Sequence, residues 1–259
     1  MKLYVMQNGT LQIPKSALVS DGTPFDLNDR SSFRDNTTIP VYTCLIEHED
    51  GLVLFDAGNS VYSPEPTPAD QTPLYCLQQL GVPPDDIRYV VCSHLHVDHG
   101  GYLKYFRKAK ILVHEEEYTS IKRLRAADQL PPAYVKQDVD EWFAAGLDWN
   151  PVSGILTQTA LLPGIDVVVL GPGHAFGMLA LLVRLPKTGN ILLAADAIYC
   201  RENAGPPIKP PAIIYDESAY RKSVTYLLRV AGENHAQIWY GHDMEQFNTF
   251  VKYNRGFYE

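Results

Sequence analysis

Four side chains that can bind a metal ion fall within one short segment, Ser93-His94-Leu95-His96-Val97-Asp98-His99-Gly100. In an extended backbone alternate side chains point to one face, so His94, His96 and Asp98 share a face and His99 leaves it. One loop can therefore offer ligands to two metal positions. Two imidazoles suit one borderline-soft divalent ion, and a carboxylate with a third imidazole suits a second. Such a pair of ions with open coordination generates hydroxide at neutral pH.

The neighbouring residues indicate that this segment is a loop between a strand and a helix. Residues 87–92 are mostly apolar and typical of a buried strand, and a short helical stretch is expected from Tyr102, after two glycines. The sites of α/β proteins are normally built on such loops. The alternative is that these histidines are solvated or hydrogen-bonded residues. It requires half of the chain's eight histidines to gather in or near this loop by chance.

Three later segments each place one His or Asp just after an apolar strand. His174 follows a strand at 167–170, Asp196 follows one at 191–195, and His242 follows one at 237–240. The residues beside them are small and allow close approach of the backbone. Each segment alone carries little weight. Together with the histidine-rich loop they supply seven ligands, enough for two metal ions that share a carboxylate.

Mixed strands and helices along the chain predict two packed sheets with helices outside them. Two hairpins are expected: a pair of short strands within 3–13 around an Asn8-Gly9 turn, and strands at 41–47 and 52–56 around an exposed His48. Further strands are expected at 110–114 and 179–185. Helices are expected at 72–80, from 115, at 138–145 and at 218–231, the last with Asp216 or Ser218 as its N-cap. His114, at the start of the helix from 115, is expected to serve local structure and not to bind metal.

The organisation of the chain predicts a single domain over residues 1–259, because no linker is long enough to separate two domains. Two polar loops, 14–40 and 60–73, are long, and long loops often border sites. The first contains five apolar residues, which either anchor it to the core or line a pocket for an acyl chain: Leu18, Val19, Phe25, Leu27 and Phe33.

Composition narrows the class of protein. Hydrophobic residues make up 46% and charged residues 20%, as in ordinary globular proteins, and the net charge of -8 argues against nucleic acid or an anionic membrane as a partner. We expect no signal peptide and no membrane span. Four widely spaced cysteines without a CxxC motif predict a reduced, cytoplasmic protein without disulfides. Absence of Gly-x-Ser-x-Gly removes the commonest type of esterase.

The run from Phe55-Asp56-Ala57-Gly58, through the histidine-rich loop, to Gly241-His242 resembles the metallo-β-lactamase superfamily. The resemblance implies an αββα sandwich, in the α/β (α+β) class, with a metal site at one edge of its two sheets. It implies a first ion held by His94, His96 and His174, a second held by Asp98, His99 and His242, and Asp196 as the bridge. Asp56 would orient these ligands from outside, or else serve as a turn acceptor before Gly58. Zinc fits the ligands, and iron, cobalt and manganese also accept them.

Tyr199, three residues after Asp196, is similar to a tyrosine of the N-acyl homoserine lactonases within that superfamily. The resemblance implies a quorum-quenching enzyme, with a homodimer as a plausible assembly, that opens a lactone with a hydroxide bridging two metals. Tyr199 would stabilise the charge on the carbonyl oxygen, and Asp98 would pass the proton of the nucleophile to the leaving alkoxide. The stretch 246–258 is also similar to a lactonase that acts on a pyridoxine breakdown product.

Several alternatives stay open at this point. Met178 stands where related lactonases often carry a second histidine, and Val97 replaces a bulkier aromatic residue of some members. Both differences leave the choice of substrate open. Other functions for the same fold are a glyoxalase II-like thioesterase or other esterase, a β-lactamase, a phosphodiesterase and an iron-dependent oxidoreductase. A metal-binding protein without catalytic activity is the remaining class.

Overall fold

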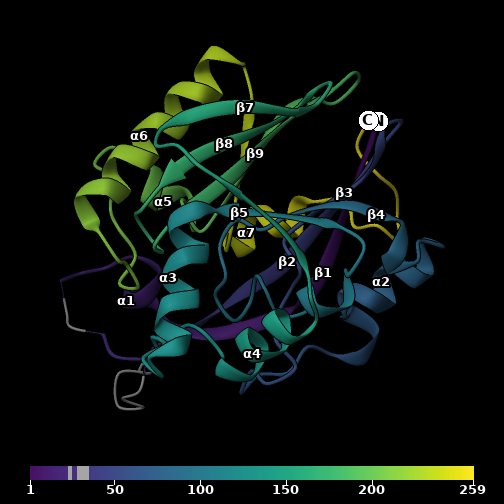
Figure 1. The fold of residues 1–259 in the computed structure, drawn as a ribbon. Coiled ribbons are helices and arrows are strands. Elements are labelled where there is room, and N and C mark those ends of the chain that lie inside the picture. Colours follow the sequence, from purple (N-terminus) through teal and green to yellow (C-terminus); the bar gives the residue numbers. More distant parts are fainter. Residues whose placement is uncertain (23–24, 28–34) are drawn as a thin grey trace.

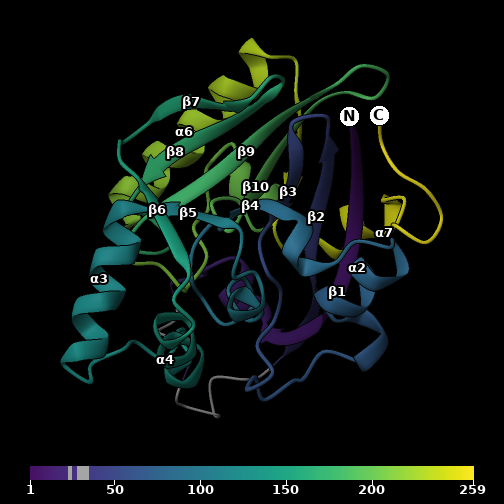
Figure 2. The same ribbon diagram turned by 45° about the vertical axis from the view of Figure 1, so that its right-hand side comes forward.

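The chain forms two β-sheets that pack face to face (Figures 1 and 2). A computed structural model describes residues 1–22, 25–27 and 35–259. The first sheet has the order β1 (Lys2–Pro14), β2 (Asn36–His48), β3 (Gly51–Phe55), β4 (Ile87–Val91), β5 (Lys110–His114) and β6 (Asp148–Val152). The second has the order β11 (Gln237–Tyr240), β10 (Gly189–Ala195), β9 (Met178–Leu185), β8 (Ile165–Gly171) and β7 (Thr157–Leu162).

Helices cover the outer face of each sheet (Figure 1). The first sheet carries α2 (Pro73–Gln79), α3 (Glu115–Ala126) and α4 (Lys136–Ala144), and the second carries α6 (Glu217–Glu233). The shorter helices are α1 (Lys15–Leu18), α5 (Arg201–Ala204) and α7 (Met244–Thr249), with single 3-10 turns at Ala69–Gln71, Pro84–Asp86 and Leu103–Tyr105. None of the helices in the described ranges combines the length and apolar character needed to cross a bilayer.

The alternation of side chains along the strands divides the apolar residues into three cores. On β2, Cys44 and Ile46 enter the core between the sheets, whereas Leu45 packs under the helices of the first sheet. On β9, Leu181 lies between the sheets and Leu182 packs under α6. The layers are therefore helix, sheet, sheet and helix, which confirms the predicted αββα sandwich.

Most predicted elements are present within a few residues of their expected bounds, and Asp216 is the N-cap of α6. The predicted turn at Asn8-Gly9 is wrong. Residues 2–14 form one continuous strand whose register shifts between Gln7 and Thr10, and Gly9 takes the positive φ of 89° inside that irregularity. The loop 14–40 is shorter than expected, because α1 and the start of β2 occupy its two ends.

His48 is also less exposed than predicted. Its ring reaches the Pro163 carbonyl at 3.0 Å and accepts a hydrogen bond from the Asp50 N–H at 2.9 Å, which leaves its side chain 5% exposed. His114 caps α3, as expected, by accepting from the Glu116 N–H. Met178, in place of a histidine, packs in the core under α6, and all four cysteines are buried free thiols.

The carboxyl ends of several strands meet at one edge of the sandwich. β3 and β4 are parallel neighbours in the first sheet, and β10 and β11 are parallel neighbours in the second. Parallel strands end on the same side, so the residues that follow Phe55, Val91, Ala195 and Tyr240 are brought together. This edge carries the candidate metal ligands.

Candidate metal centre

The seven predicted ligands lie together in two buried groups. The first group contains His94, His96, His174 and Asp196, and the second contains Asp98, His99 and His242. Within each group the ligand atoms lie within 4.8 Å of one another, and none of the seven residues is more than 8% exposed. Residues up to 148 positions apart in the chain, such as His94 and His242, therefore share one small volume.

Asp196 lies between the two groups, with one oxygen facing each. Its Oδ2 is 3.3 Å from His174 Nε2 and 3.8 Å from His94 Nε2. Its Oδ1 is 3.1 Å from His99 Nε2 and 3.0 Å from His242 Nε2. Asp98 Oδ2 approaches the same two nitrogens of the second group, at 3.6 and 3.5 Å. A carboxylate in this position can bind two ions at once.

The outward-facing nitrogens of three histidines have partners that fix the orientation of the rings. His174 Nδ1 lies 2.8 Å from the Ile213 carbonyl, and His242 Nδ1 lies 2.9 Å from the Pro40 carbonyl. A carbonyl only accepts, so each Nδ1 carries the proton and each Nε2 keeps its lone pair for a metal. His99 Nδ1 lies 2.8 Å from Asp56 Oδ2 in the same arrangement.

Asp56 orients the histidine-rich loop as well as one ring. Its Oδ1 accepts from the Ser93 N–H at 2.7 Å, and its Oδ2 accepts from the Ser93 hydroxyl at 3.0 Å. Its backbone φ is +61°, in the left-handed region, which Asp tolerates better than most residues and which is often retained at functional sites. Asp56 therefore holds the start of the loop and the His99 ring in one arrangement. This role is larger than that of a simple turn acceptor before Gly58.

The buried polar atoms at the centre fit a divalent metal. His94 Nε2, His99 Nε2 and Asp196 Oδ1 are buried and have no hydrogen-bond partner among the described residues. Burial lowers the pKa of His94 and His96, aided by neighbouring histidines, and favours the neutral form that binds metal. Burial also acts to lower the pKa of His99. The Asp196, Asp98 and Asp56 carboxylates outweigh this effect, so the pKa of His99 is raised.

Close packing of two strand ends places His242 beside Asp196. A Cβ atom on Gly241 would lie 2.6 Å from the Ala195 carbonyl oxygen and 2.9 Å from Asp196 Oδ1. Only glycine allows this approach. Ala195 itself has a φ of +45°, a conformation that alanine rarely adopts, so the backbone before Asp196 is strained.

Tyr199 lies at the border of both ligand groups. Its ring centre is 5.3 Å from that of His174 and 4.9 Å from that of His242, and its hydroxyl is 3.5 Å from His174 Nδ1. Burial raises the pKa of Tyr199 well above its usual range, and the Asp196 and Asp98 carboxylates add to the rise. The hydroxyl therefore stays protonated and can donate a hydrogen bond next to the candidate metal ligands.

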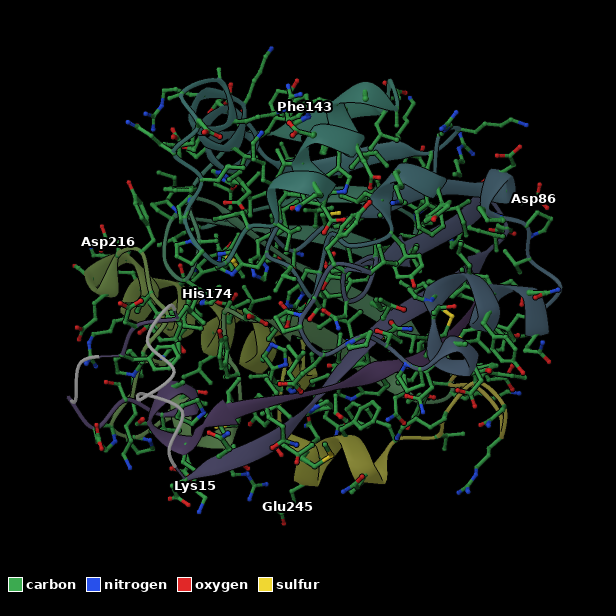
Figure 3. The ribbon with its side chains drawn as sticks, turned by 90° about the horizontal axis from the view of Figure 1, so that it is seen from below. Lys15, Asp86, Phe143, His174, Asp216 and Glu245 are labelled. Atoms are coloured by element: carbon green, nitrogen blue, oxygen red, sulfur yellow. The ribbon has the colours of Figure 1, made fainter. Side chains whose placement is uncertain are left out.

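An apolar pocket of about 300 Å³ opens beside His96 and His174. Besides His96, its lining comes from four segments: Phe25 to Leu27, Pro131 to Tyr134, His174 to Phe176 and Ala212 to Tyr215. In the view from below, His174 lies inward from the edge of the molecule, near the end of α6 marked by Asp216 (Figure 3). The Tyr215 and Asp216 N–H groups each donate to the Gly173 carbonyl at 2.9 Å, which ties the pocket wall to the His174 turn.

The apolar residues of the loop 14–40 divide between two hollows. Phe25 and Leu27 line the pocket beside the histidines. Leu18 and Val19 line a different hollow with Lys15 and Thr37. Phe33 lies outside the described residues.

The sequence prediction missed one buried acid next to the centre, Glu117. The acidic run at Glu115, Glu116 and Glu117 was interpreted only as a favourable start for the helix from 115. The spacing held a further signal, because Glu117 and the apolar Ile121 are four residues apart and share the buried face of α3. No spacing in the sequence indicated that the backbone carbonyls of Pro40 and Ile213 would contact His242 and His174.

Comparisons with known proteins agree with this geometry. The profile of the metallo-beta-lactamase superfamily matches residues 36–238. N-acyl homoserine lactonase AiiB of Agrobacterium fabrum is 32% identical, with 100% of this chain and 99% of the relative aligned, and AiiB of Rhizobium rhizogenes is 30% identical with the same coverage. The crystal structure of a quorum-quenching N-acyl homoserine lactone lactonase superposes with a TM-score of 0.82 at 26% identity, covering 100% of this chain and 98% of that one. The chain therefore belongs to the metallo-β-lactamase superfamily and, within it, to the family of the N-acyl homoserine lactonases.

Proposed function

We propose that this protein is a metal-dependent lactonase that hydrolyses N-acyl homoserine lactones and so quenches quorum sensing. The observation that carries the proposal is the position of Asp196, whose two oxygens face two complete ligand groups next to Tyr199 and an apolar pocket. The two relatives that align over their full length are both named N-acyl homoserine lactonase, which supports this class of substrate.

One ion would be held by His94, His96 and His174, and the other by Asp98, His99 and His242. Asp196 would bind both ions. The mixture of imidazole and carboxylate ligands supports zinc. When bound, two such ions would lower the pKa of a water molecule and polarise the lactone carbonyl.

The side chains around the ions supply the proton transfers and the orientation. Asp98, 8% exposed, would accept the proton of the attacking water at its carboxylate and deliver it to the ring oxygen as the ring C–O bond breaks. The Tyr199 hydroxyl would donate a hydrogen bond to the carbonyl oxygen while that oxygen gains negative charge. The apolar pocket would hold the acyl chain and exclude water from the reacting ester.

We further propose that residues 1–259 act as one catalytic domain in the cytoplasm. The buried free cysteines support a reducing compartment. A homodimer is the assembly that the family resemblance supports, and sedimentation analysis of the purified protein tests it.

A lactone panel tests the proposed function. We expect acid release from N-acyl homoserine lactones, with KM falling as the acyl chain lengthens into the pocket. Each buried CH₂ is worth about 0.8 kcal/mol, so KM should fall up to about fourfold per methylene until the pocket is full. Phe25→Ala should reduce this gain, whereas Val19→Ala should preserve it, because Val19 comes from the same loop but lines the other hollow.

Two results of the panel would contradict the proposal. Preference for a bicyclic aromatic lactone, with no response to acyl length, would favour the pyridoxolactonase-like alternative. Turnover of thioesters or β-lactams with no turnover of lactones would favour another hydrolase of the superfamily.

Tyr199→Phe should lower turnover by about 10² to 10³-fold, because loss of one hydrogen-bond donor to a developing oxyanion typically has that effect. Metal content should stay at the wild-type level, since the ring remains and only the hydroxyl is removed. Tyr220→Phe is the matched control, because that hydroxyl is buried without a partner in the described residues. Wild-type kinetics for Tyr199→Phe would remove its hydroxyl from the mechanism.

A further inference from the structure

Glu117 is a fully buried acid that the chemistry above does not use. It lies on α3, is 0% exposed, and forms no ion pair with a basic side chain in the described part of the chain. Burial raises its pKa to about 7, although hydrogen bonds from Leu95, Tyr134 and Gly177 oppose the rise. A carboxylate in such a place is unfavourable unless its contacts compensate for the lost water.

Two hydrogen-bond partners of Glu117 come from two different ligand-bearing segments. Its Oε1 accepts from the Leu95 N–H at 2.9 Å, and Leu95 stands between His94 and His96. Its Oε2 accepts from the Gly177 N–H at 3.2 Å, in the turn that follows His174. One carboxylate therefore joins the loop after β4 of the first sheet to the turn before β9 of the second.

A third partner extends the contact to the pocket wall. The Tyr134 hydroxyl donates to Glu117 Oε1 at 3.0 Å, while the Tyr134 ring packs edge-on against His96 with centres 4.6 Å apart. Phe176 stacks on the Tyr134 ring with centres 5.8 Å apart. Tyr134 and Phe176 both line the pocket.

The turn at Gly177 has little freedom to move away from Glu117. A Cβ atom on Gly177 would lie 2.2 Å from the Nδ1 atom of His114, so the turn presses directly on that ring. His114 is held in turn by the Gly154 carbonyl at 2.8 Å and by its capping contact with α3. The separation of the two ligand segments at this point is thus fixed from both sides.

We propose that Glu117 is a positioning residue of the metal centre, which sets the distance between the His94/His96 loop and the His174 turn and holds the Tyr134 wall of the pocket. The inference rests on the ligand set of the proposed function. His96 Nδ1 and His174 Nε2 are 2.9 Å apart across this joint, so a small displacement there changes the geometry offered to the first ion.

Glu117→Gln tests the proposal with little change in shape. The glutamine oxygen can still accept from one segment, but its NH₂ group faces the N–H of the other and cannot accept from it. We expect the folded variant to bind Co²⁺ about 10- to 100-fold more weakly at one position, with an altered visible spectrum, as for lost outer partners of metal ligands. Chelator competition measures the affinity. Glu116→Gln, exposed on the same helix, should match the wild type.

A double-mutant cycle shows which Co²⁺ position Glu117 supports. In a His174→Ala background, Glu117→Gln should cause no further loss of Co²⁺ affinity, because the position it supports is already impaired. If Glu117→Gln does not fold, Tyr134→Phe decides, since it removes one hydrogen bond and keeps the carboxylate. Tyr134→Phe should then bind Co²⁺ more weakly than the wild type and have a higher KM.

Wild-type Co²⁺ affinity and spectrum in folded Glu117→Gln would overturn the proposal, even with a lower melting temperature, because a purely structural role predicts that result. Wild-type affinity and KM in Tyr134→Phe would overturn it in the same way. If the wild-type protein hydrolyses no lactone while the Co²⁺ affinity of Glu117→Gln still falls, the proposed substrate is wrong and the positioning role stands.

Discussion

Asp196→Ala is expected to lower lactone hydrolysis by well over 100-fold and to leave the protein without its pair of metal ions. Loss of an outer partner of a metal ligand typically costs about 10- to 100-fold, and Asp196 lies in direct reach of four imidazoles. Removing it takes away a carboxylate whose two oxygens face the two ligand groups. It also leaves the Nε2 atoms of His99 and His242 without their nearest negative charge.

Elemental analysis of metal per folded chain, together with kcat on an N-acyl homoserine lactone, measures this effect. Asp148→Ala is a suitable control, because Asp148 is an exposed residue at the start of β6. A fully active Asp196→Ala protein, or one that keeps the wild-type metal content, would exclude a bridging role for this carboxylate.

Removal of the metals is expected to destabilise the folded protein. Without cations, the buried Asp98 and Asp196 carboxylates and five buried imidazoles are left with unmatched charges and lone pairs. A ligand that binds only the folded state at 100 times its Kd adds about 2.7 kcal/mol to the free energy of unfolding. For a chain of this size that difference corresponds to a fall in Tm of about 5 to 11 °C.

Thermal unfolding with and without a chelator, followed by re-addition of zinc, measures the shift. Asp196→Ala protein should show a smaller response to the chelator than the wild type, because it binds less metal at the start. An unchanged Tm in wild-type protein shown to be free of metal would mean that the ligand cluster is stable on its own.

The gathering of the seven candidate ligands was predictable because their signals are local in the chain. Four of them stand within six residues, and His174, Asp196 and His242 each follow an apolar strand bordered by small residues. Strands that end at one edge of a sandwich bring such residues together without further information. The apolar periodicity that defined these strands also predicted the layers.

Features that depend on tertiary contacts were not predictable in the same way. β7 has the sequence TQTALL and an exposed face, so it lacks the apolar run that marks a buried strand. The Asn8-Gly9 pair resembles a hairpin turn, but pairing of β1 with β2 on both sides of it keeps the strand continuous. Glu117 acquires its role from Leu95 and Gly177, which lie 22 and 60 residues away along the chain.

The hydrogen bond from His174 to Ile213 limits how this enzyme can change during evolution. Ile213 lines the pocket, while its main-chain carbonyl orients the ring of the candidate metal ligand His174. Replacing the side chain reshapes the pocket and leaves the carbonyl in place. Inserting or deleting a residue in the same segment moves the carbonyl and disturbs the ring. Substrate preference can therefore diverge among homologues by substitutions in this loop, while the hydrogen bond to His174 constrains the length of the loop.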